Sequence, residues 1–194
     1  MDLLRAFIAI EIPARVQDEI QAATASLQNT LGPDLVRWVA PRNLHLTLKF
    51  LGDISPASVE ILQQMLRTES GQHRPFEIRL EGLGAFPTVH RPRVIWTGLV
   101  APGALDSLQR GIESASARLG YEAEERPFSP HLTLGRVKQN LTTAGLQRVR
   151  MALEQTQIGD LGTARVEALH LFRSDLQPGG SIYTRLFSAN LGRS

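Results

Sequence analysis

The chain of 194 residues contains no cysteine, which excludes disulfide bonds, thiolate chemistry and any zinc site built from cysteine. It also lacks an apolar run long enough to span a membrane, and Asp2 and Arg5 interrupt the N-terminus before a signal peptide could form. Low-complexity runs and glycine-rich phosphate loops of the Walker or dinucleotide type are absent too. We therefore expect a cytoplasmic protein without membrane association.

Lysine is scarce. Lys and Arg together number 21, but only Lys49 and Lys138 are lysines, which leaves 19 arginines. The net charge is only +2, so no overall positive field for a long nucleic acid is expected. The arginine excess has two interpretations: genomic base composition, or recognition of phosphate by planar guanidinium groups.

Histidine is also infrequent, with five residues, yet the tetrapeptide His-Leu-Thr-Leu occurs twice, at His45–Leu48 and His131–Leu134. Chance is a poor explanation for this match, and internal repeats carry information about architecture. The spacing within each copy is typical of a half-buried strand, because side chains on a strand alternate between two faces. Each strand would display an imidazole and, about 7 Å further along, a hydroxyl.

Alternation assigns the side chains of each copy to two faces. His45, Thr47 and Lys49 are expected on one face of the first strand. His131 and Thr133 are expected on the corresponding face of the second, where Gly135 leaves the third position without a side chain. The opposite face then carries Leu44, Leu46, Leu48 and Phe50 in the first copy, and Leu132 and Leu134 in the second.

The order of periodic segments predicts an α+β fold: one bilobal domain, residues 1–194, with two pseudo-symmetric lobes. The lobes would be mainly antiparallel sheet with outer helices, facing each other across a central groove. Each motif is followed by a helix and then by two extended segments. Expected strands are Leu4–Ile12, Val36–Val39, Leu44–Leu51, Phe76–Leu83, Arg93–Leu99, His131–Val137, Thr163–Phe172 and Tyr183–Asn190, with a turn over 177–180. Expected helices run from Pro13 to near Gly32, from Ser55-Pro56 past Leu66, from Leu105 to Leu119, and from Thr143 to Leu153.

Two histidines can also bind a metal, or serve only as buried structural residues. A zinc centre needs three or four ligands, but no third ligand recurs with the motif spacing, because Asp53 lies near the first copy only. His73, His90 and His170 have no Thr two positions later, and we interpret His170 as a structural or surface residue. No metal or other cofactor is therefore expected.

Acid–base chemistry fits the repeated pair best, because two imidazoles can be held with one neutral and one protonated near neutral pH. One takes a proton from an attacking hydroxyl or water, and the other donates to a leaving oxygen. Thr47 and Thr133 would hydrogen-bond the non-bridging oxygens. This constellation suits in-line displacement at phosphorus, without a metal if the substrate carries its own nucleophile or a strained cyclic phosphate.

The two motifs, with their flanks, resemble the signature of the two-histidine phosphoesterases. The resemblance is closest to the bacterial and archaeal RNA 2',3'-cyclic phosphodiesterase group, also called 2'-5' RNA ligases, and runs nearly end to end. Matching segments are Arg5–Ala9 with Pro13, Trp38, Asn43–Gly52, Phe86-Pro87, Pro92–Gly98, Pro130–Arg136, and Ser174 with Gly179, Gly180 and Tyr183.

The resemblance implies an enzyme that hydrolyses RNA 2',3'-cyclic phosphate ends, tRNA fragments among them, to 2'-phosphate ends. It also implies the reverse 2'-5' ligation without ATP. His45 would be the general acid and His131 the base, with the roles swapped on reversal. We expect a monomer.

The resemblance also supplies candidate substrate-binding residues. It implies that Arg136 helps to hold phosphate charge. Strict alternation places Arg136 on the face opposite His131, so it reaches the site only if the strand ends or twists at Gly135. Lys49 is either a second phosphate-binding residue or an exposed strand lysine. Phe7 is either near the base-binding end of the groove or a core aromatic residue.

The residues leave two other functions open. One is a phosphodiesterase for a different small substrate, such as a cyclic-phosphorylated ADP-ribose or a 2'-5' oligoadenylate. The other is a non-catalytic module that binds RNA ends.

Overall fold

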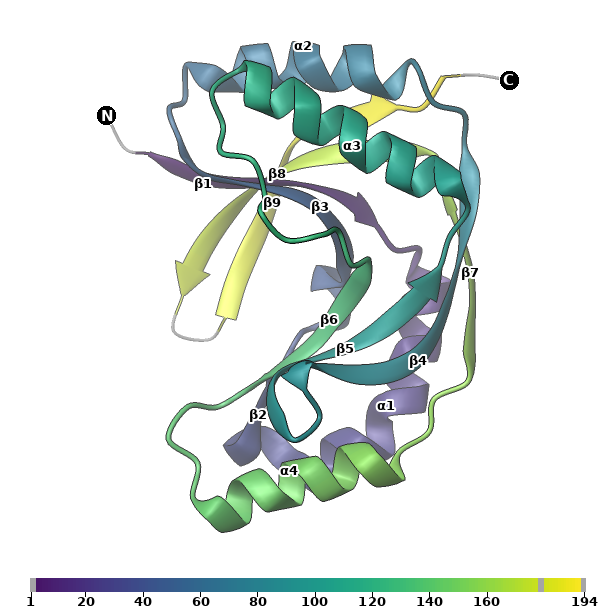
Figure 1. Ribbon diagram of the computed structural model, residues 1–194, viewed down its shortest axis with the longest axis vertical. Coiled ribbons are helices and arrows are strands. Elements are labelled where there is room, and N and C mark those ends of the chain that lie inside the picture. The colour runs from purple at the N-terminus through teal and green to yellow at the C-terminus, as the bar shows by residue number, and fades with distance from the viewer. Residues whose placement is uncertain (1–2, 178–179, 193–194) are drawn as a thin grey trace.

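The computed structural model describes residues 3–177 and 180–192, which form an α+β fold of antiparallel strands and four α-helices (Figure 1). The predicted fold class is confirmed. The helices are α1 (Ala14–Leu35), α2 (Ser58–Ser70), α3 (Gly103–Arg118) and α4 (Thr143–Gln155), and a short 3-10 helix spans Pro41–Asn43. The strands are β1 (Leu4–Glu11), β2 (Val36–Trp38), β3 (His45–Ile54), β4 (Phe76–Thr88), β5 (Arg91–Val100), β6 (His131–Val137), β7 (Asp160–Val166), β8 (Ala168–Gln177) and β9 (Gly180–Asn190).

The strands form one curled sheet in the order β7-β4-β5-β6-β3-β1-β8-β9, with β2 added on β6. Within the described residues, β3 and β6 are joined by a single bridge, between Leu46 and Leu132. The sheet therefore consists of two halves that meet at the two motif strands. We call β3, β1, β8 and β9 the His45 half, and β6, β5, β4, β7 and β2 the His131 half.

Each half is covered by its own pair of helices. Figure 1 shows α2 and α3 at one end of the molecule and α1 and α4 at the other, with the sheet between them. Alternate strand residues such as Ile8, Leu46, Ile95 and Leu132 are fully buried. Burying an aliphatic side chain of this size contributes roughly 1.5–3 kcal/mol, so the apolar face of each strand is fixed against its helices.

The end of α1 differs from the prediction. Gly32, expected near the end of the helix, has a φ of 63° and marks a kink. Only glycine adopts this conformation at little cost. Pro33, whose ring presets φ for the first turn of a helix, then begins a further turn that ends at Leu35.

The extended segment expected over Thr163–Phe172 is two strands in different halves of the sheet. β7 pairs with β4 and ends at Val166, whereas β8 begins at Ala168 and pairs with β1. The prediction of one strand was wrong because apolar alternation continues through the change of partner. The turn predicted over 177–180 includes 178 and 179, which lie outside the described residues. No helix in the described residues is long and apolar enough to cross a membrane.

Candidate active site

The bridge between Leu46 and Leu132 places the two motifs side by side. Each of these leucines immediately follows a motif histidine, and both are fully buried on the helix side of the sheet. Because the pairing is antiparallel, one further step in register sets His45 opposite Thr133 and Thr47 opposite His131. The four side chains therefore share the other side of the sheet, which we call the motif face.

Both histidines are oriented by the same hydrogen bond. The Nδ1 of His45 lies 2.7 Å from the carbonyl oxygen of Asn43, and the Nδ1 of His131 lies 2.7 Å from that of Ser129. A carbonyl oxygen can only accept, so we assign the proton to Nδ1 in both rings. Each neutral imidazole then keeps Nε2 free to accept a proton. Sequence reasoning missed this feature because a backbone acceptor two residues away leaves no signal in residue type.

Aromatic rings surround both imidazoles. The His45 ring lies 4.8 Å from Phe7 and meets Tyr183 edge-on at 5.1 Å, as measured between ring centroids. The His131 ring meets Phe86 edge-on at 4.9 Å and lies 6.4 Å from Trp96. These contacts limit the motion of each ring and displace water from around it.

A missing side chain makes room for Trp96. Gly84 lies opposite Trp96 in the β4–β5 pair, and a Cβ atom at Gly84 would lie 2.3 Å from the indole ring. Any larger residue at this position would displace the indole. Gly84 therefore helps to place Trp96 beside His131.

The electrostatic environment of His45 favours the neutral ring. Burial lowers the pKa of His45 below its ordinary value of 6.5, and the hydrogen bond to Asn43 and the charge of Glu11 oppose this effect only in part. Glu11 lies opposite His45 in the β1–β3 pair. A lowered pKa makes the protonated ring a stronger proton donor.

A pocket of about 390 Å³ opens beside His45. This volume is within the range of pockets that bind small molecules. Phe7 is 3% exposed and stacks on Phe172 at 5.3 Å, so it is a buried aromatic residue that also forms part of the pocket wall. The polar side chains of the pocket wall are those of Glu11, Arg42, Asn43, Ser181, Tyr183 and Arg185.

Arg136 reaches the motif face because β6 contains a bulge. Trp96 pairs with Thr133 but Ile95 pairs with Gly135, so one extra residue is inserted in β6. Gly135 then faces the core, where an added Cβ would lie 2.7 Å from Val36. Arg136 follows on the motif face, exposed and opposite Arg37 of β2. The departure from alternation anticipated at Gly135 therefore occurs.

Lys49 lies on the other side of the sheet, and the expectation that it shares a face with His45 was wrong. β3 contains a bulge as well, because Ala9 pairs with Thr47 and Ile8 with Lys49. The extra residue turns Lys49 toward the helices, where it is 5% exposed. Phe50 takes its place on the motif face, 63% exposed and 6.2 Å from Phe7.

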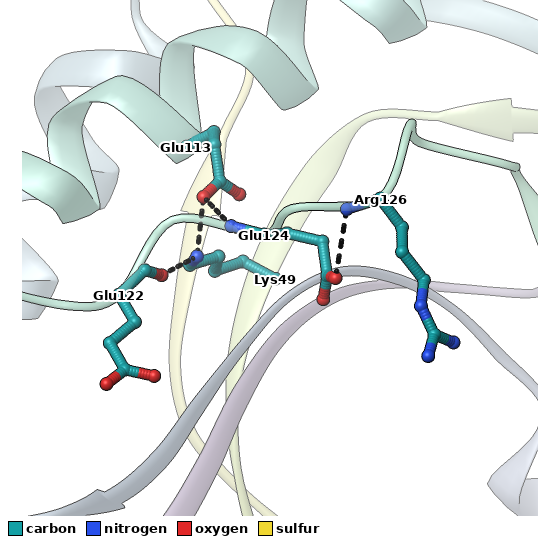
Figure 2. Close-up of polar contacts among 5 residues, drawn as sticks. All are labelled: Lys49, Glu113, Glu122, Glu124 and Arg126. Carbon is teal, nitrogen blue, oxygen red and sulfur yellow. Dashed lines mark hydrogen bonds and ion pairs between the residues drawn. The ribbon is translucent and has the colours of Figure 1, made fainter.

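The ammonium group of Lys49 is already bound by protein atoms. Its Nζ lies 2.6 Å from the carboxylate of Glu113 on α3 and also donates to the carbonyl oxygen of Glu122 (Figure 2). The same carboxylate oxygen accepts a hydrogen bond from the backbone N–H of Glu124 at 2.9 Å. These contacts hold the Lys49 side chain away from the motif face.

His170 lies beside the site without joining the motif pair. Its side chain is 11% exposed and its Nδ1 lies 2.9 Å from the hydroxyl of Ser188, as expected of a structural histidine. Its Nε2 is 3.8 Å from the carboxylate of Glu11, which also contacts Arg185. No group of three or more His, Cys, Asp or Glu that could hold a metal occurs in the described residues.

The chain is similar to known proteins over most of its length. The family described as LigT like Phosphoesterase matches residues 10–96 and 99–183. A protein of Methanothermobacter thermautotrophicus named RNA 2',3'-cyclic phosphodiesterase is 33% identical over 181 residues, covering 93% of this chain and 95% of that protein. A protein of the same name from Aquifex aeolicus is 31% identical over 203 residues, covering 99% of this chain and 100% of that protein. The structure of E. coli LigT complexed with 3'-AMP has a TM-score of 0.75 at 29% identity and covers 97% of this chain and 98% of that one.

Proposed function

This chain belongs to the LigT-like phosphoesterase family, and we propose that it hydrolyses RNA 2',3'-cyclic phosphate ends to 2'-phosphate ends with His45 and His131 as acid and base. The observation that carries the proposal is the matched pair of imidazoles, each fixed through Nδ1 and each on the motif face. The names of the M. thermautotrophicus and A. aeolicus relatives support the choice of substrate. We expect a cytoplasmic monomer that acts on ends such as those of tRNA fragments.

The two rings would divide the proton transfers of an in-line displacement. Nε2 of His131 takes a proton from water, the water oxygen bonds to phosphorus, and the bond from phosphorus to the 3' oxygen breaks. Protonated His45 gives its Nε2 proton to the departing 3' oxygen, which leaves a 2'-phosphate and a 3'-hydroxyl. The lowered pKa of His45 makes the protonated ring a stronger acid, and the fraction of His45 that is protonated falls as the pH rises through that pKa.

Neutral and cationic groups on the motif face would hold the phosphate. Thr47 and Thr133 are half-buried beside the histidines and can donate hydroxyl protons to non-bridging oxygens. Arg136 adds a guanidinium group, and Arg37 lies directly opposite it. Like charges on opposite residues of neighbouring strands destabilise the pair. A bound phosphate would offset that repulsion through charge-assisted hydrogen bonds.

The pocket beside His45 would bind the nucleoside next to the cyclic phosphate. Its wall includes the rings of Phe7, Phe172 and Tyr183. Stacking of a base on an aromatic side chain typically contributes about 1–3 kcal/mol. The similarity to a LigT structure complexed with 3'-AMP is consistent with a nucleotide ligand.

The site would also form 2'-5' linkages without ATP. When a 5'-hydroxyl takes the place of water, His131 takes its proton, the 5' oxygen bonds to phosphorus, and the 3' oxygen leaves with a proton from His45. The two roles swap only when a 2'-5' linkage is cleaved back to the cyclic phosphate. Opening of the cyclic phosphate drives this step, so no nucleotide cofactor is needed.

The direct test is to incubate the protein, with a chelator present, with a short RNA that ends in a 2',3'-cyclic phosphate. We expect conversion to a 2'-phosphate end. Mass spectrometry should show that the cyclic phosphate has been opened by water, and resistance of the product to treatments that need a free 2'-hydroxyl should show that the phosphate is on the 2' oxygen. Cyclic-phosphorylated ADP-ribose and a 2'-5' oligoadenylate, tested in parallel, should turn over more slowly. Tight binding of the RNA without conversion would contradict the proposal and identify a binding module instead.

A further inference from the structure

The relative position of His45 and His131 depends on more than the strand pairing. In the described part of the chain, β3 and β6 share only the bridge between Leu46 and Leu132. The segment of residues 119–130 connects α3, which packs on the His45 half, to β6 in the His131 half (Figure 1). This connecting segment also contains Ser129, whose carbonyl oxygen orients the His131 ring.

Lys49 attaches the connecting segment to the strand that carries His45. Its Nζ binds the carboxylate of Glu113 and the carbonyl oxygen of Glu122, and the Glu113 carboxylate accepts from the N–H of Glu124. Figure 2 shows Lys49 and Glu113 converging on this part of the segment. Strand β3, helix α3 and the connecting segment are thus joined at one point.

Stability alone is a weak explanation for this ion pair. The Lys49 side chain is 3% exposed and the Glu113 side chain 20% exposed, so both are largely removed from water. The second carboxylate oxygen of Glu113 is buried without a hydrogen-bond partner among the described residues. Replacement of a buried ion pair by apolar residues of similar size is often neutral or stabilising, because desolvation offsets the attraction. The pair therefore calls for a role other than stability.

We propose that Lys49 and Glu113 are positioning residues that fix the connecting segment, and through Ser129 the ring of His131, relative to the strand of His45. Lys49 is four residues after His45, and Glu124 is seven residues before His131. Neither Lys49 nor Glu113 touches the substrate in this assignment. The effect of this positioning on kcat rests on the proposed function, but its effect on the His131 ring does not.

The informative variant is the double substitution Lys49→Met/Glu113→Met. Lys49→Met alone would leave a buried carboxylate without its cation and could fail to fold, whereas the double variant removes both charges and preserves side-chain length. We expect a thermal midpoint close to that of the wild type and little change in KM. We also expect kcat to fall at least about tenfold, because small displacements of catalytic groups are costly.

A spectroscopic measurement separates positioning from activity. In the wild type, ¹⁵N NMR should show the Nδ1–H tautomer for the neutral rings of both His45 and His131. In the double variant the His131 signal should shift toward a mixture of tautomers while that of His45 stays unchanged. This result can be read even if the protein does not turn over the RNA, so it distinguishes failure of this inference from failure of the proposed function.

Two control variants accompany the double substitution. Glu113→Gln keeps a side-chain oxygen for Lys49 and for the N–H of Glu124, so the His131 signal should not move, although the thermal midpoint should fall because the buried ammonium loses its anion. Arg150→Met/Glu154→Met removes an exposed ion pair on α4 and should change neither kcat nor the His131 signal. A folded Lys49→Met/Glu113→Met protein with wild-type kcat and an unchanged His131 signal would overturn the inference. A fall in kcat that only tracks lost stability would overturn it too.

Discussion

The two motif strands, β3 and β6, contain a bulge at the same position, but the side chains that follow the bulge differ in chemistry. Each has a bulge after its Thr, which turns the fourth residue after the histidine toward the core and the fifth onto the motif face. In β3 these residues are Lys49 and Phe50, and in β6 they are Gly135 and Arg136. At the position after the bulge, the His45 half therefore presents an aromatic side chain and the His131 half a cationic one. The difference teaches that the repeat sets the backbone geometry, while the side chain after the bulge differs between the two halves.

The largest expected effect tests whether the two halves contribute equally to the chemistry. His45→Ala and His131→Ala should each lower kcat about hundredfold to ten-thousandfold, because each removes one proton-transfer group. The measurement is kcat on cyclic-phosphate RNA, with thermal unfolding to confirm that each variant is folded. The matched control is His90→Ala, which changes an exposed histidine outside the motifs. A loss of only a few-fold in either motif variant would show that its histidine is not an acid or base.

A change of leaving group should reveal the difference between the two histidines. A substrate in which sulfur replaces the bridging 3' oxygen needs no general acid, because a thiolate leaves without protonation. His45→Ala should recover most of its lost activity on this substrate, whereas His131→Ala should recover little. The measurement is the rate of each variant on the sulfur substrate relative to its rate on the oxygen substrate. Recovery by His131→Ala instead would reverse the assignment of acid and base.

The residues that follow the bulges should show a smaller contrast. Arg136→Met should lower kcat/KM about tenfold to hundredfold, because hydrogen bonds to a charged group contribute roughly 1.5–3 kcal/mol. Phe50→Ala should leave kcat/KM within about threefold, since its ring is 63% exposed. Steady-state kinetics on one RNA substrate compares them directly. Equal losses in kcat/KM would mean that Phe50 and Arg136 do not have separate roles.

The smallest expected effect concerns stability and pH. Burial lowers the pKa of His45, and also that of His170, in the folded state. The unfolded chain therefore binds more protons at mildly acidic pH, so the free energy of unfolding is greatest above the unfolded pKa of about 6.5 and falls at lower pH. His45→Gln should reduce the change in unfolding free energy with pH by at most about 1.4 kcal/mol for each unit by which folding lowers the pKa of His45. Chemical denaturation at pH 5 and pH 7 measures the free energy of unfolding of each protein. If that free energy changed by the same amount between the two pH values in the wild type and in His45→Gln, the lowered pKa of His45 would be contradicted.

The sequence predicted the order of helices and strands well, because apolar periodicity reflects which face of each element is buried. Strand His131–Val137 was predicted with the boundaries that the structure has. The change of partner at Glu167 was missed, since alternation shows which face is buried but not which strand lies alongside. The two lobes were predicted. The bridge between Leu46 and Leu132 that joins them depends on which strands pair, and neither strand's sequence alone predicts that pairing.

The candidate site was predicted in part. The repeat located His45, Thr47, His131 and Thr133, and the structure places them on one face. An end or twist of the strand was considered at Gly135 of β6, but no departure from alternation was considered for β3, where Lys49 gives no such signal. Bulges are set by hydrogen bonding to a partner strand, so residue type reveals them only when glycine is present.

The dependence of kcat/KM on pH, measured with a chelator present on an RNA ending in a 2',3'-cyclic phosphate, tests the central claim most directly. An acid and a base acting together predict a bell-shaped profile for the wild type. His45→Gln and His131→Gln should each lose a different limb. A profile without a maximum, or activity abolished by the chelator, would contradict catalysis by the two histidines.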